Sequence, residues 1–80
     1  MPFAVGQRIR LTQDVQSGFS DRMIPRGTLG SIVEAYAVPE EGYAVDVAIP
    51  DESLAGGFVY DNVILRPGQF AVVTGADKAT

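Results

Sequence analysis

Apolar and polar side chains alternate along several short stretches of this chain, with the period of two that is typical of β-strands. Ile9 and Leu11 alternate with arginines and a threonine in the first of these stretches. From Tyr43 to Ile49, every second residue is a bulky apolar one, and alanines or an aspartate stand between them. No helical period of convincing length occurs. The pattern predicts an all-β domain in which each strand turns one face to a core.

The stretch around which the other strands are arranged begins with a turn at Pro25 and ends at Tyr36. Pro25 fixes φ at the value preferred at the second position of a type I turn, and Gly27 suits the fourth position. Gly30 interrupts the strand that follows, and a glycine inside a strand usually marks a bulge, a bend or a close backbone approach. A strand that leaves a tight turn and bends halfway is what a small closed barrel requires.

Two polar stretches separate the remaining strands. Residues 16–22 are polar without periodicity and predict a long loop, in which Phe19 covers one open end of the barrel. Residues 61–63 predict a single 3₁₀ turn between two short strands, residues 58–60 and residues 64–66. The chain therefore contains about five short strands, a number that suits a small β-barrel.

The end of the chain continues past a complete barrel. Gln69 to Val73 is apolar enough to pack on its own barrel or on another subunit. Eighty residues make one domain. We expect residues 1–73 to form a single barrel domain and residues 74–80 to form a flexible C-terminal tail.

Composition excludes several classes of chemistry. The chain has no cysteine and no histidine, which excludes serine–histidine and cysteine–histidine catalysis and an ordinary zinc site. Asp46, Asp51, Glu52 and Asp61 lack the ligand spacing of a calcium loop. We therefore predict no catalytic residue, no metal and no cofactor, and a role that is not enzymatic.

Charge and hydropathy restrict the partners. Six Lys plus Arg against ten Asp plus Glu give a net charge of −4, which disfavours nucleic acid because phosphate binding relies on clustered cations. The chain has neither an apolar run of membrane-spanning length nor a signal-peptide pattern, so we expect a cytoplasmic protein without a membrane partner. With 46% apolar residues in so short a chain, we expect a homo-oligomer, a dimer or a tetramer.

Three segments carry a recognisable pattern. Gly6 to Asp14 is a polar first strand, Ile24 to Val33 combines a Pro-Arg-Gly turn with Gly-Thr-x-Gly-x-Ile-Val, and Gly42 to Val47 contains Tyr-x-Val. Together they resemble a group of small bacterial domains of unknown function that fold as SH3-like barrels. The resemblance implies an SH3-like small barrel of about five strands with one short 3₁₀ turn.

The same strands support a second resemblance. Gly6 to Arg10, Gly30 to Tyr36 and Glu41 to Val45 are similar to the first three strands of the plasmid-borne type II dihydrofolate reductases. Those enzymes are homotetramers with one active site in a central pore, so the resemblance implies a pore-type enzyme as an alternative function. Their motif Val-Gln-Ile-Tyr corresponds to Gly57 to Tyr60 here, with Phe58 in place of the glutamine, and Leu11 stands where they have a lysine. These replacements remove the polar edge and the cation that would hold a folate.

Aromatic side chains are the candidates for a binding surface. Phe58 and Tyr60 share one face of their strand, and we interpret them as core residues in preference to a site. If that face instead lines a cleft or a subunit seam, they form an aromatic surface with Tyr36 or Tyr43. The full set of ligand or interface candidates is Phe58, Val59, Tyr60, Tyr36, Tyr43 and Phe70. The predicted function is an interaction module that binds a protein, a small molecule or itself through one barrel face.

Overall fold

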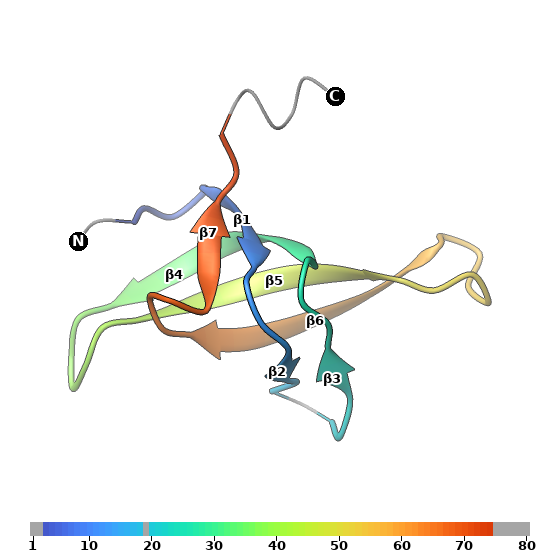
Figure 1. The fold of residues 1–80 in the computed structure, drawn as a ribbon, viewed down its shortest axis with the longest axis horizontal. Helices are drawn as coiled ribbons and strands as arrows, with labels where there is room; N and C mark the ends of the chain where they lie inside the picture. The colour runs from blue at the N-terminus through green and yellow to red at the C-terminus, as the bar shows by residue number, and fades with distance from the viewer. Residues whose placement is uncertain (1–2, 19, 75–80) are drawn as a thin grey trace.

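The computed structural model describes residues 3–18 and 20–74, and in these residues the chain is all-β (Figure 1). The strands are β1 (Arg8–Leu11), β2 (Val15–Gln16), β3 (Met23–Ile24), β4 (Leu29–Tyr36), β5 (Gly42–Pro50), β6 (Phe58–Leu65) and β7 (Phe70–Val72). A 5-stranded sheet has the order β6-β5-β4-β1-β7, and β2 and β3 form a 2-stranded sheet. The predicted all-β class is confirmed.

The larger sheet curls around the core. β4, β5 and β6 follow one another as an antiparallel meander, and β1 pairs with the other side of β4. β7 then returns to pair with β1, so the last strand lies beside the first. In Figure 1, β1 and β7 cross the long direction of β4, β5 and β6, and one sheet therefore lines two sides of the core.

Alternation along β1 and β5 builds this core. Ile9 and Leu11 are buried while the arginines between them are exposed, as the period of two predicts. Tyr43, Val45 and Val47 face the same core from β5. Burial of each such side chain contributes roughly 1.5–3 kcal/mol. The core cluster consists of Ile9, Leu11, Val15, Ile24, Ile32, Tyr43, Val45, Val47, Val63, Leu65 and Phe70.

The turn before β4 differs by one residue from the prediction. The Thr28 amide donates to the Pro25 carbonyl at 3.2 Å, so Pro25 takes the first position and not the second. Gly27 takes the third position with φ at +91°, a conformation that fits a type II turn and not a type I turn. Its amide donates to the Leu11 carbonyl at 2.9 Å, which ties the turn to the end of β1.

The irregularity of β4 lies beyond Gly30. The pairing of β4 with β5 shifts register between Ile32 and Glu34, so the bulge of this strand lies beyond Gly30. Gly30 is instead a point of close approach, because a Cβ built on it would lie 2.6 Å from the Asp46 carbonyl oxygen and 2.8 Å from a methyl of Val45. The glycine allows β4 to approach its neighbour β5 closely on the side that faces the core.

β6 corrects the prediction of two short strands around a 3₁₀ turn. Residues 58–65 form one continuous strand paired with β5 throughout. Asp61 and Asn62, which disfavour strands by propensity, are held there by polar partners. The Asn62 side-chain amide donates to Asp46 on β5 at 2.6 Å, and the Ser17 hydroxyl donates to Asp61 at 2.6 Å. Tertiary hydrogen bonds thus override the local preference for a turn.

Most of the predicted long loop, residues 17–22, lies between two short strands that form a hairpin. β2 and β3 pair through Val15 with Ile24 and through Gln16 with Met23. The Ser17 amide donates to the Arg22 carbonyl at 2.9 Å and narrows the loop further. Phe19, for which we predicted a position over the end of the barrel, lies outside the described residues.

The segment after β6 packs on its own sheet. β7 pairs with β1, and the Phe70 ring lies edge-on to Phe3 and Tyr43, with ring centroids 4.9 and 5.6 Å apart. Of the two predicted positions for Gln69 to Val73, its own barrel is the observed one. Most of the predicted C-terminal tail, residues 75–80, lies outside the described residues.

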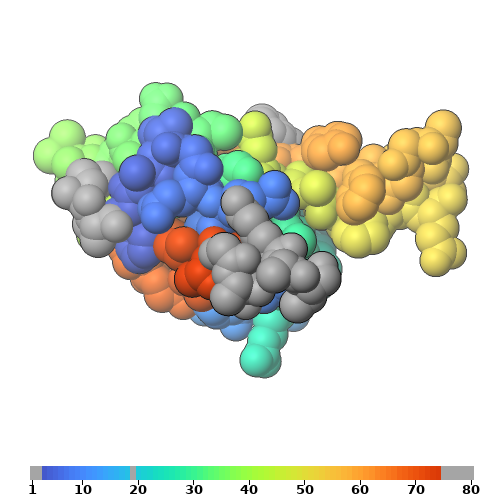
Figure 2. Space-filling model, turned by 90° about the horizontal axis from the view of Figure 1, so that it is seen from above, coloured from blue at the N-terminus to red at the C-terminus, as the bar shows by residue number. Residues whose placement is uncertain are grey.

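One element leaves the body of the molecule. The β5–β6 hairpin extends past the other strands, at the right of Figures 1 and 2, within overall dimensions of 38 × 33 × 19 Å. Its closing loop is ordered by backbone hydrogen bonds, from the Asp51 amide to the Gly57 carbonyl at 2.9 Å and from the Leu54 amide to the Asp51 carbonyl at 3.2 Å. The hairpin therefore presents side chains that no other described strand covers.

Candidate functional site

The face of β4, β5 and β6 that points away from the core is unusually apolar. Register places Leu29 of β4, Ala48 of β5 and Tyr60 of β6 in one row across this face. The next row towards the end of the hairpin joins Pro50 and Phe58. Alternation predicts polar residues on a solvent face, so these two rows depart from the expected pattern.

A groove of about 750 Å³ lies on this face, and we name it the outer-face groove. Its size is within the range of roughly 300–1,000 Å³ that is usual for ligand sites. The groove is bounded by the first strand, the turn before β4 and the base of the projecting hairpin. Its side chains include Arg8, Arg26, Leu29, Val33, Asp46, Ala48, Pro50, Phe58 and Tyr60.

Phe58 and Tyr60 form the aromatic wall of the outer-face groove. They are 44% and 74% exposed, with ring centroids 6.4 Å apart and an interplanar angle of 34°. Our interpretation of them as core residues is wrong. Without a 3₁₀ turn, side-chain parity runs unbroken from Leu65 back to Phe58, and the buried positions are Val63 and Leu65. Phe58 and Tyr60 therefore fall on the opposite, outer face.

Two arginines line the groove on the other side. Arg8 pairs with Ser31 across the sheet, and Arg26 belongs to the turn before β4, where its amide donates to Asp14 at 2.7 Å. Among the described residues, the guanidinium groups of Arg8 and Arg26 form no ion pair with a carboxylate. The groove thus combines an apolar floor, an aromatic wall and two cations without a described anionic partner.

The remaining candidates do not line the groove. Tyr43 and Phe70 belong to the core, and Val59 lies on the face of β6 opposite to Tyr60. Tyr36 is 40% exposed and pairs with Gly42 at the other end of β4. Tyr36 and Tyr43 flank the β4–β5 turn in the sequence, a position from which a cross-strand contact between them would be expected. Because Tyr43 pairs with the residue before Tyr36, the two tyrosines point to opposite faces and make no such contact.

The hydroxyl of Tyr43 is part of the core packing. It donates a hydrogen bond to a carboxylate oxygen of Glu41. Burial, together with the hydrogen bond and the negative charge of Glu41, raises the pKa of Tyr43 to about 12. Tyr43 therefore remains neutral over the ordinary pH range and stabilises the fold.

Sequence reasoning missed most of the residues that line the groove, among them Arg8, Arg26, Leu29 and Val33. The alternation in β1 did place Arg8 on the solvent side, but nothing local linked it to Phe58 or Tyr60. Leu29 is 38% and Val33 is 44% exposed, although the sequence marks both only as apolar residues of a strand. Val33 stands at the register shift, which no local signal marks.

The described residues contain no group of three or more histidine, cysteine or acidic side chains that could hold a metal ion. They also contain no helix long and apolar enough to cross a membrane. Comparison with protein-family models, curated proteins and solved structures finds no match to this chain. The resemblances to SH3-like domains and to type II dihydrofolate reductases stay predictions, and the site must be interpreted from its own chemistry.

Proposed function

We propose that this domain is a small non-enzymatic interaction module that binds through its outer-face groove and associates with itself there. The observation that carries the proposal is the exposure of Phe58 and Tyr60 beside Leu29 in a groove on a sheet face. Contiguous exposed apolar surface on a soluble domain commonly marks an interaction site. Aromatic residues and arginine are also the types that dominate binding energy at interfaces.

The small size of the domain favours self-association through this surface. A chain of 80 residues has a small core, and burying apolar surface between copies is a common supplement. A two-fold dimer is the simplest closed assembly, since it uses the same patch on both copies. The packing of Phe70 in its own core removes one argument for association, the apolar segment left after the barrel, and leaves the groove as the basis of the proposal.

The pore-type reductase remains the alternative prediction, and no observation favours it. Leu11, at the position of the family's lysine, is 1% exposed and faces the core. Phe58 supplies an apolar ring where the family uses an amide. The two arginines of the groove come from other positions, so they do not restore that motif.

Sedimentation equilibrium on the intact chain tests the proposal. We expect a dimer or higher oligomer in the micromolar range, and a shift to monomer for Phe58→Ser combined with Tyr60→Ser. Ile64→Ser is the matched control, because Ile64 is 57% exposed on the same face of β6 but does not line the groove. A monomeric wild-type chain, or equal effects of the groove and control variants, would contradict the proposal.

A further inference from the structure

We infer that the projecting end of the β5–β6 hairpin from a second copy of this chain binds to the arginine side of the outer-face groove, reciprocally in a two-fold dimer. The inference rests on the proposed function and names the occupant of the groove. It follows from three observations: the charge of the groove, the charge of the hairpin end and the distance between them in one chain.

The loop that closes the hairpin, residues 51–57, is acidic and partly apolar, and we name it the hairpin tip. Glu52 and Leu54 are exposed, and Asp51 is partly exposed. Asp51 accepts hydrogen bonds from the Ser53 hydroxyl at 2.6 Å and from the Ser53 amide at 3.0 Å. These bonds, with a smaller contribution from Arg22, lower the pKa of Asp51. The hairpin tip therefore presents two carboxylates near an exposed leucine, and hydrogen bonds hold the carboxylate of Asp51 in place.

The arginine side of the groove has the complementary composition, whereas Asp46, a carboxylate in the same lining, accepts a hydrogen bond from the Asn62 side chain. Arg8 and Arg26 have no ion pair among the described residues, although the whole chain carries a net charge of −4. Leu29 and Val33 provide exposed apolar surface beside them. An occupant with carboxylates could pair with the arginines, and an aliphatic side chain on it could pack on the apolar surface. The hairpin tip carries carboxylates and a leucine.

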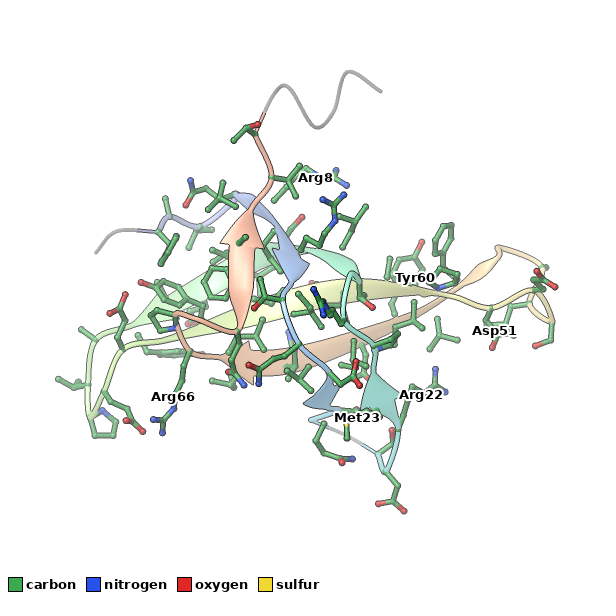
Figure 3. The ribbon with its side chains drawn as sticks, in the orientation of Figure 1. Arg8, Arg22, Met23, Asp51, Tyr60 and Arg66 are labelled. Atoms are coloured by element: carbon green, nitrogen blue, oxygen red, sulfur yellow. The ribbon has the colours of Figure 1, made fainter. Side chains whose placement is uncertain are left out.

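One chain cannot make this contact with itself. In Figure 3, Arg8 lies over the body of the molecule, Tyr60 lies further along the hairpin and Asp51 lies at its far end. Figure 2 shows the hairpin directed away from the body. The tip and the arginine side of the groove therefore need two molecules to meet.

A second copy fits better than an unrelated acidic partner because the tip continues from the groove. Pro50 and Phe58 line the groove and are also the last paired residues before the tip. Two copies that meet groove to groove through Phe58 and Tyr60 thus bring each tip across the face of the other. A two-fold axis makes the contact twice, so both pairs of arginines gain carboxylates at once.

A charge-swap experiment tests the inference. The groove variant carries Arg8→Glu and Arg26→Glu, and the tip variant carries Asp51→Asn and Glu52→Lys. Asparagine keeps an oxygen that can accept the Ser53 hydrogen bonds, so the tip should retain its turn. Each variant places like charges opposite one another twice, and we expect each to weaken its own dimer by about tenfold or more.

The mixture of the two variants is the decisive sample. In the mixed dimer, the glutamates of one groove face the lysine of one tip, and the native groove faces the native tip. We therefore expect the mixed dimer to regain an affinity within roughly threefold of the wild type, measured by sedimentation velocity with one variant labelled. Arg66→Glu is the control for a charge reversal outside the groove, since Arg66 pairs with Glu40 and does not line the groove.

Other outcomes separate the two proposals. If the wild type dimerises through Phe58 and Tyr60 but the mixture is no tighter than either variant alone, the tip contact is wrong and the proposed function stands. If the wild type is monomeric, both fail. On the unchanged chain, we expect dissociation to increase several-fold as ionic strength is raised from low to physiological, because exposed charges are screened. A dimer affinity independent of salt would also overturn the inference.

Discussion

The two ends of the β5–β6 ladder use the same pairing and the same alternation, yet their side chains have different surroundings. At the body of the molecule, Tyr43 and Leu65 face each other on the inner side and are both 0% exposed. Towards the hairpin tip, Ile49 and Val59 form a pair on the same side and are only partly buried. The difference comes from what covers them, because β1 and β7 lie over the first pair (Figure 1).

The comparison shows that period alone does not make a core. A strand pair buries its apolar face only where a second layer lies against that face. Where the hairpin extends beyond this layer, the same pattern leaves apolar surface for a partner. Substitutions in the body should therefore lower the free energy of unfolding. Substitutions on the outer face of the hairpin should instead weaken association.

The largest expected difference in stability is between substitutions of Phe70, in the body, and of Tyr60, on the hairpin. Phe70→Ala removes a ring packed against Phe3 and Tyr43, and we expect it to lower the free energy of unfolding by about 3–5 kcal/mol. Tyr60→Ala removes a ring that is 74% exposed and should change it by less than about 0.5 kcal/mol in the monomer. Urea denaturation at a concentration too low for association measures both. Similar losses for the two variants would remove the distinction between body and hairpin.

A pair of glycines sharpens the same comparison. Gly30→Val forces a side chain against the backbone of Asp46 and the methyl groups of Val45 and Val47, and we expect a loss of about 1–3 kcal/mol. Gly56→Val, in the hairpin tip, meets nothing within 4 Å and needs no positive φ, so its effect should be close to zero. The urea midpoints of the two variants check this. A midpoint for the Gly30 variant equal to that of the Gly56 variant would show that the close approach is relieved without cost.

Alkaline pH should lower the stability of the fold through Tyr43 in the body and not through the hairpin tip. The pKa of Tyr43 rises from 10.0 to about 12 on folding, so the unfolded chain loses its proton first. Stability from this group is complete below pH 10 and declines as pH rises from 10 towards 12. We expect Tyr43→Phe to be less stable at neutral pH, through loss of the hydrogen bond to Glu41, and to show a smaller decline in that range. Thermal unfolding of both chains across this range is the measurement, and equal slopes would contradict the assignment.

Local sequence determined that β1, β4 and β5 are strands and which face of β1 and β5 is buried. The alternation in β1 and β5 placed Ile9, Leu11 and the residues from Tyr43 to Ile49 correctly, because a strand turns successive side chains to opposite faces. It also placed Phe58 and Tyr60 on a common face. These are properties of the backbone itself, and any sheet that contains the strands must respect them.

Tertiary structure alone decided that β6 is continuous and that its aromatic face is the outer one. The local sequence predicts a turn at Asp61 and Asn62. In the fold they form part of a strand, because Ser17 and Asp46, distant in sequence, are their hydrogen-bond partners. That continuity sets the parity of Phe58, and cross-strand register then brings Arg8 and Tyr60 to one groove. The alternation of apolar and polar residues is a local property of the chain. Strand register, and which strands cover a given face, arise from contacts between distant segments, and the candidate site depends on these contacts.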